Sequence, residues 1–127
     1  MKDNKMEKKI KIMLVEDEVL IAQSMSIELE IAGYEMCKFV AYGEDAIETA
    51  KKENPDIILM DIHLAGKMDG IEAAKKIQEF TDIPIIFVSG YNEPKIVERA
   101  KQINPVAYLE KPVEAWFLKS IIDPIIK

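Results

Sequence analysis

Cysteine occurs only once in the 127 residues, as Cys37. A single cysteine cannot form an intrachain disulfide, and it excludes structural zinc sites built from several cysteines. Long apolar runs are missing as well: the longest, Ile83 to Val88, is only strand length, whereas a membrane helix needs about 20 apolar residues. The charged start of the chain is not followed by the apolar region of a signal peptide. We therefore expect a cytoplasmic protein that does not enter a membrane.

A basic excess is also missing. The chain has 17 Lys and Arg against 23 Asp and Glu, which gives a net charge of -6. Phosphate contacts require clustered basic side chains, so direct binding to nucleic acid is not expected. The length fits one domain, and we expect a solvated tail at residues 1–9 followed by one folded domain at 10–127.

Short apolar runs alternate with longer amphipathic segments along the chain. The expected strands are 10–15, 34–40, 56–61, 83–89 and 106–110. The expected helices are 19–32, 43–53, 69–80, 93–103 and 113–123. We expect Gly33 to follow the end of the first helix and Pro124 to stop or bend the last one. Such alternation predicts an α/β fold with a parallel sheet and helices on both faces. The best match is a flavodoxin-like, doubly wound five-stranded sheet of order 2-1-3-4-5 with five helices.

Polar side chains stand where four of the five expected strands end. These side chains are Glu16 and Asp17, Asp61, Ser89 and Lys111. In a sheet of this order, the first and third strands are neighbours at the switch point where such folds bind ligands. Three carboxylates therefore converge there, with a hydroxyl and an ammonium at the same rim.

Carboxylates packed together repel one another unless a cation joins them. Oxygen ligands without sulfur or imidazole favour Mg²⁺ above other ions. A lysine and a serine hydroxyl beside such an ion complement phosphoryl oxygens. The pattern therefore predicts a Mg²⁺-assisted phosphoryl site in which a carboxylate is the nucleophile.

From about residue 10 onward the sequence resembles a response-regulator receiver domain of the two-component phosphorelay systems. The residues that carry the resemblance are Glu16-Asp17, Asp61, Asp69-Gly70, Ser89 and Lys111-Pro112. Each motif alone is weak, but their order and their places at strand ends make the combination specific.

The resemblance implies a role for each residue of the site. Asp61 is the expected phospho-acceptor, which takes a phosphoryl group from a phosphohistidine of a sensor histidine kinase. Asp17, Asp61 and the backbone carbonyl of His63 are the expected Mg²⁺ ligands, and Glu16 reaches the ion through water. Lys111 pairs with the phosphoryl group, and the Lys111-Pro112 peptide bond is expected to be cis.

The resemblance also implies a switch. Ser89 is expected to move toward the phosphoryl group, and Tyr108 turns inward when it does. The change is expected on the face formed by the helix 93–103, the strand 106–110 and the helix 113–123. His63 and Tyr91 stand at positions that tune hydrolysis of the phosphoaspartate, which leads to the hypothesis that the Tyr91 ring shields the phosphoryl group.

Several alternatives remain beside this interpretation. The chain is expected to be a signalling switch rather than an enzyme, because Asp61-Ile62-His63 lacks the second acid of an aspartyl phosphatase. A docking-only pseudo-receiver and a receiver cut from a hybrid kinase or transcription factor remain open. The expected partners are a sensor histidine kinase and a downstream protein target or fused output domain. A monomer and a phosphorylation-dependent dimer are both open.

Overall fold

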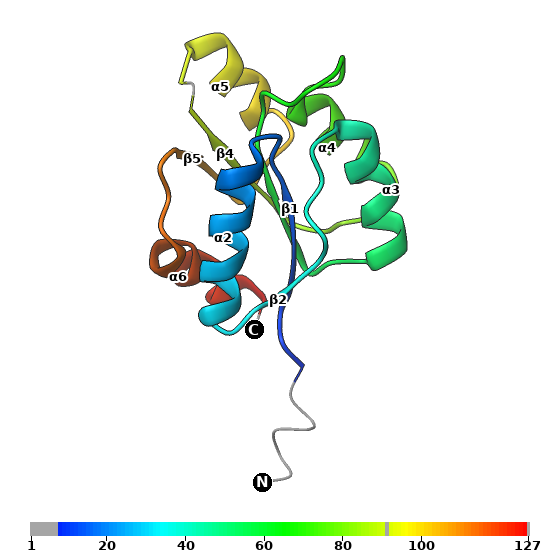
Figure 1. Cartoon of the computed structure of the whole chain (residues 1–127). Helices are drawn as coiled ribbons and strands as arrows, with labels where there is room; N and C mark the ends of the chain where they lie inside the picture. Colours follow the sequence, from blue (N-terminus) through cyan, green and yellow to red (C-terminus); the bar gives the residue numbers. More distant parts are fainter. Residues whose placement is uncertain (1–7, 91, 127) are drawn as a thin grey trace, which may run out of the picture.

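The chain is seen in a computed structural model that describes residues 8–90 and 92–126. Most of the expected tail and the hypothesis about Tyr91 lie outside the described residues. The elements are β1 (Lys11–Val15), α2 (Val19–Ile31), β2 (Glu35–Met36), α3 (Gly43–Glu53), β3 (Ile57–Met60), α4 (Gly70–Gln78), β4 (Ile85–Ser89), α5 (Pro94–Lys101), β5 (Ala107–Glu110) and α6 (Ala115–Ile126). Figure 1 shows their arrangement.

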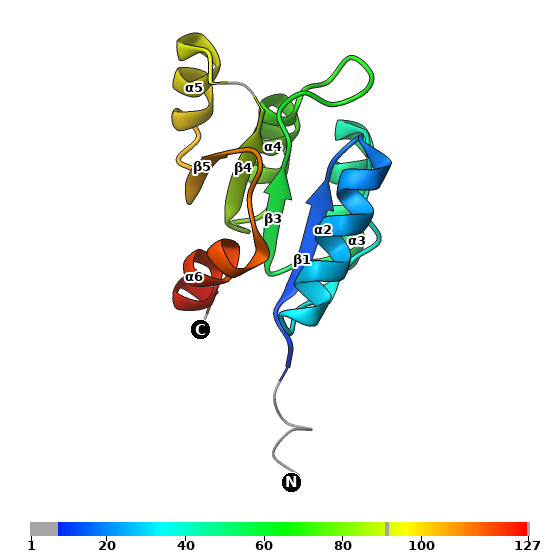
Figure 2. The ribbon, with the colours of Figure 1, turned by 60° about the vertical axis from the view of Figure 1, so that its left-hand side comes forward.

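The five strands form one parallel sheet of order β2-β1-β3-β4-β5. This confirms the expected fold class and strand order. Figure 2 shows the arrowheads of β1 and β3 pointing the same way, so their carboxyl ends meet at one edge of the sheet. None of the helices within residues 8–90 and 92–126 is long and apolar enough to cross a membrane.

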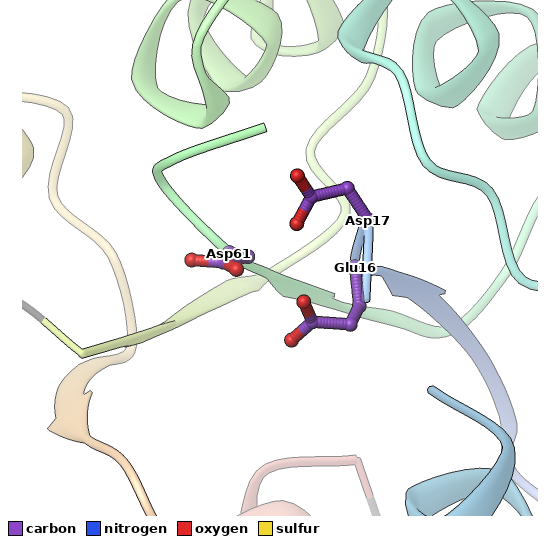
Figure 3. A group of neighbouring side chains, drawn as sticks. All are labelled: Glu16, Asp17 and Asp61. Atoms are coloured by element: carbon purple, nitrogen blue, oxygen red, sulfur yellow. The ribbon is translucent and has the colours of Figure 1, made fainter. Parts of the chain in front are cut away.

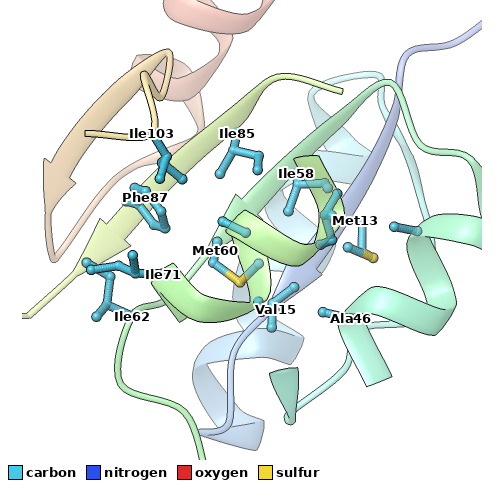
Figure 4. Packing of buried hydrophobic residues seen from close by; sticks show 14 of the residues in the cluster. Met13, Val15, Ala46, Ile58, Met60, Ile62, Ile71, Ile85, Phe87 and Ile103 are labelled. Atoms are coloured by element: carbon cyan, nitrogen blue, oxygen red, sulfur yellow. The ribbon is translucent and has the colours of Figure 1, made fainter. Parts of the chain in front are cut away.

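Alternate residues of the central strands belong to two separate cores because successive side chains in a strand point to opposite faces. On β3, Ile58 and Met60 pack toward the layer of α3, α4 and α5, as Figure 4 shows for this cluster. Ile57 and Leu59 pack toward α2 and α6 on the other face. Burial on both faces explains why these strands are almost continuously apolar.

The C-terminal end of α2 follows the expected chemistry. Gly33 has a φ of +108°, the left-handed conformation that glycine adopts without steric cost. The amide of Gly33 donates to the carbonyl of Glu30, and the amide of Tyr34 donates to the carbonyl of Leu29. This pair of bonds is a Schellman motif, and it turns the chain from α2 into β2.

Two expected boundaries are wrong. The second strand is not continuous over residues 34–40: β2 pairs with β1 only at Glu35–Met36, and Val40 forms one isolated bridge with Val15. Pro124 is expected to stop or bend the last helix, and the stop is wrong because α6 continues to Ile126. A proline removes only its own N–H, and the carbonyl left unpaired belongs to Ser120, an exposed residue that water reaches.

Candidate functional site

The two strands at the switch point place the acidic side chains. Val15 of β1 lies opposite Met60 of β3 in the parallel register. Each strand is followed directly by an acidic residue, Glu16 after β1 and Asp61 after β3. The amide of Asp61 donates to the carbonyl of Val15 at 3.0 Å. The register therefore fixes the two carboxyl-bearing residues side by side.

Asp17 completes a group of three carboxylates. One carboxylate oxygen from each of Glu16, Asp17 and Asp61 lies within 4.8 Å of the others. Figure 3 shows the three side chains gathered around one space. Glu16 is 3% exposed and Asp61 is 6% exposed, whereas Asp17 is partly exposed. This arrangement confirms the expected convergence, and the all-oxygen donor set fits Mg²⁺.

Lys111 provides a cation at this site. Its Nζ donates to Glu16 Oε1 at 2.7 Å and to Asp61 Oδ2 at 2.9 Å. Burial lowers the pKa of Lys111, but the bonds to Glu16 and Asp61 outweigh this effect and raise it above its ordinary value. The Lys111-Pro112 peptide bond is cis, as expected. The ammonium offsets part of the repulsion between the two buried carboxylates.

A comparison of the sequence with models of protein families shows the family to which this chain belongs. Residues 12–123 match the model of the response regulator receiver domain, which is most of the chain. This chain belongs to the response regulator receiver family. Receiver domains are signalling modules of two-component systems, and they work with histidine kinases and output domains.

Known relatives of this receiver agree. It is 33% identical to the transcriptional regulatory protein PdtaR of Mycobacterium tuberculosis over 102 residues, which cover 80% of this chain and 49% of PdtaR. It is 30% identical to the transcriptional regulatory protein YdfI of Bacillus subtilis, over 92% of this chain and 55% of YdfI. The receiver thus spans about half the length of these two relatives.

Solved structures give the same result. The signal receiver domain of a modulated diguanylate cyclase from Desulfovibrio desulfuricans G20 superposes with a TM-score of 0.88 at 37% identity, covering 94% of each chain. A CheY-like receiver domain protein from Methanospirillum hungatei JF-1 superposes with a TM-score of 0.84 at 26% identity, again covering 94% of each chain.

Ser89 and Tyr108 lie on neighbouring strands of this receiver. Ser89 is the last residue of β4 and is fully buried, and Tyr108 is partly buried on β5. Burial raises the pKa of Tyr108, and a hydrogen bond with the Ser89 side chain opposes that rise. The Tyr108 ring also packs against Phe87, with ring centroids 6.4 Å apart. The two expected switch residues are therefore in direct contact.

His63 contacts Asp61 through its backbone amide. The amide of His63 donates to Asp61 Oδ1 at 3.3 Å, and the His63 side chain is exposed. This contact holds one carboxylate oxygen of Asp61, while Lys111 holds the other. The role of the His63 carbonyl as a metal ligand stays a prediction.

The sequence pattern does not predict how closely Gly70 approaches Asp61. A Cβ built at Gly70 would lie 2.0 Å from the carbonyl oxygen of Asp61, and the Gly70 amide donates to the carbonyl of Ile62 at 2.7 Å. The loop after Asp61 thus folds back onto the strand end, and only a residue without a side chain fits. The Asp-Gly pair at the start of the predicted helix was the available signal.

The neighbouring Asp69 has two partners that the sequence pattern did not predict. It caps α4 in a capping box with Glu72. Its Oδ2 also lies 3.2 Å from a guanidinium nitrogen of Arg99 on α5. The loop that follows Asp61 is therefore tied to α5, on the side of the receiver where the switch is expected.

Proposed function

We propose that this receiver accepts a phosphoryl group on Asp61 from a phosphohistidine of a sensor histidine kinase. The observation that carries the proposal is the setting of Asp61: a buried carboxylate 2.9 Å from the Lys111 ammonium and within 4.8 Å of two further carboxylates. Such a carboxylate needs no general base to act as a nucleophile. Its difficulty is the approach of an anionic phosphoryl group.

In the transfer, an oxygen of Asp61 forms a bond to phosphorus while the P–N bond to the kinase imidazole breaks. The imidazole nitrogen keeps the electron pair and takes up a proton. Asp17, Asp61 and the His63 carbonyl would hold Mg²⁺, with Glu16 acting through water. When bound, the ion neutralises charge on the carboxylates and the phosphoryl oxygens. Lys111 pairs with a phosphoryl oxygen once Asp61 is esterified.

The phosphoryl group adds nearly two negative charges at the sheet edge. The Ser89 hydroxyl is drawn toward those charges, and its hydrogen bond with Tyr108 is broken. Tyr108 turns inward, and the face formed by α5, β5 and α6 changes. We place the downstream contact on this face, with a separate protein or a fused output domain as the partner. We place the receiver in the cytoplasm, as a monomer or a phosphorylation-dependent dimer.

The proposal is tested by transfer from a panel of histidine kinases that carry labelled phosphohistidine. The expected result is label on the wild type and none on Asp61→Ala with at least one kinase in the presence of Mg²⁺. Failure with every kinase and with a small phosphoryl donor would favour a docking-only pseudo-receiver.

A further inference from the structure

A cavity of about 410 Å³ opens beside the carboxylates, on the sheet face that α2 and α6 cover. Figure 1 shows these two helices on the same side of the sheet. Ile21 and Met25 of α2 form one wall, and Pro112 and Val113 form the opposite wall. Residues of β1, β3 and β4 form the floor. The volume falls in the range of small-molecule sites, which are mostly apolar with a few polar groups.

The charges around the cavity select the kind of ligand. The titratable side chains that line it are Glu16, Glu28, Asp61 and Lys111, three acids and one base. At its buried end, Glu16 and Asp61 carry two negative charges against the one positive charge of Lys111, which bonds to both, so the net charge there is negative when no Mg²⁺ is bound. The buried end of the cavity therefore favours a cation, and its apolar walls favour a ligand with a hydrocarbon body.

We propose that this cavity binds a small amphiphilic cation, an alkyl or arylalkyl primary ammonium ion. Its hydrocarbon body lies between Ile21 and Val113, and its ammonium donates to Glu16 and Asp61. Glu28 belongs to the exposed helix surface, where solvent screens its charge. The head group therefore lies at the buried end. If Mg²⁺ binds as proposed above, the amine and the ion share these carboxylates, and the amine reduces phosphorylation of Asp61.

The first test compares three head groups on one chain length: hexylammonium, hexanol and hexanoate. Amide chemical shifts of the full chain are followed by NMR at pH 7 without Mg²⁺. Hexylammonium is expected to bind with a dissociation constant of about 1 mM. Hexanol binds roughly tenfold more weakly because it lacks the charge-assisted hydrogen bonds. Hexanoate gives no saturable shifts. Equal binding of hexylammonium and hexanol, or no binding of either, overturns the proposal.

Two pairs of variants locate the ligand. Ser24 lines the cavity, whereas the neighbouring exposed Gln23 does not. Ser24→Phe fills the cavity and is expected to abolish hexylammonium binding, while Gln23→Phe leaves it unchanged. Glu16→Gln weakens binding roughly tenfold, and Glu28→Gln changes it less than about twofold. Equal effects within either pair would place the amine elsewhere and overturn the proposal.

All of these measurements are made without a phosphoryl donor or Mg²⁺. A failed amine titration therefore leaves the phosphorylation proposal untouched. Equally, a receiver that takes up no phosphoryl group can still bind the amine. Circular dichroism of each variant shows whether it is folded, and the head-group series on the wild type tests the proposal without any substitution.

Discussion

Lys111 Nζ lies 2.9 Å from Asp61 Oδ2 and 2.7 Å from Glu16 Oε1, so one ammonium bridges two buried carboxylates that come from neighbouring strands. Because β5 lies at the far edge of the sheet from β1, this bridge reaches across the carboxyl edge of the sheet. The bridge therefore links the charge balance of the site to the stability of the fold.

Replacing Lys111 tests this link. Lys111→Met leaves Glu16 and Asp61 buried without their cation and is expected to lower the free energy of unfolding by about 2 kcal/mol. Lys119→Met is the matched control, because Lys119 is exposed and Asp123, its partner along the same helix, keeps the hydrogen bond from the Tyr34 hydroxyl when Lys119 is replaced. It is expected to cost less than about 0.5 kcal/mol. Urea unfolding without Mg²⁺ measures both, and equal costs would show that the bridge does not stabilise the fold.

The raised pKa of Lys111 predicts a pH dependence. Burial lowers this pKa, but the bonds to Glu16 and Asp61 outweigh burial, so the folded value lies above the unfolded one. The stabilisation is complete below the unfolded pKa of about 10.4 and is lost as the pH rises through the folded value. Above about pH 10, the free energy of unfolding should fall more steeply for the wild type than for Lys111→Met. Parallel curves would contradict the raised pKa.

The close approach of Gly70 to Asp61 leads to a steric prediction. A methyl group at this position meets the carbonyl oxygen of Asp61, so Gly70→Ala is expected to cost about 3 kcal/mol by overpacking and to displace Asp61. Gly90→Ala is the control, since a Cβ there has nothing within 4 Å and should cost less than about 0.5 kcal/mol. Thermal unfolding compares the two. A fully stable Gly70→Ala would disprove the close approach.

Because Ser89 contacts Tyr108, we predict that a Ser89 variant can be phosphorylated without passing the change on to Tyr108. Ser89→Ala is expected to take up a phosphoryl group but to lose the chemical-shift changes that phosphorylation causes at Tyr108 and along α5 and α6. Ser120→Ala, an exposed serine on α6, should retain them. Full changes in Ser89→Ala would show that the signal leaves the site by another route, such as the Asp69–Arg99 pair.

The sequence predicts the place of a residue correctly where that place depends only on the strand to which the residue belongs. Apolar runs located β1, β3, β4 and β5, and the polar residues after β1, β3 and β5 located Glu16, Asp61 and Lys111. The short β2 could not be bounded in this way, because alternate residues of an edge strand face solvent and its pairing depends on the neighbouring strand.

Relationships between distant segments could not be read from the sequence. The pattern placed Lys111 at the site, but the bond from Lys111 to Glu16 depends on side-chain geometry across 95 residues. Gly70 was visible only as part of an Asp-Gly pair, because its role comes from the backbone of Asp61 folding against it. The cavity beside Ile21 and Val113 likewise depends on how α2 and the segment before α6 pack.

Phosphorylation of Asp61 is tested most directly by the intact mass of the protein after incubation with acetyl phosphate, with Mg²⁺ or with EDTA. Asp61→Asn removes the proposed acceptor. Asp56→Asn is the control, because Asp56 is an exposed aspartate directly before the first residue of β3. We expect a gain of one phosphoryl group in the wild type and in Asp56→Asn, only with Mg²⁺, and no gain in Asp61→Asn. An equal gain in Asp61→Asn would contradict this expectation.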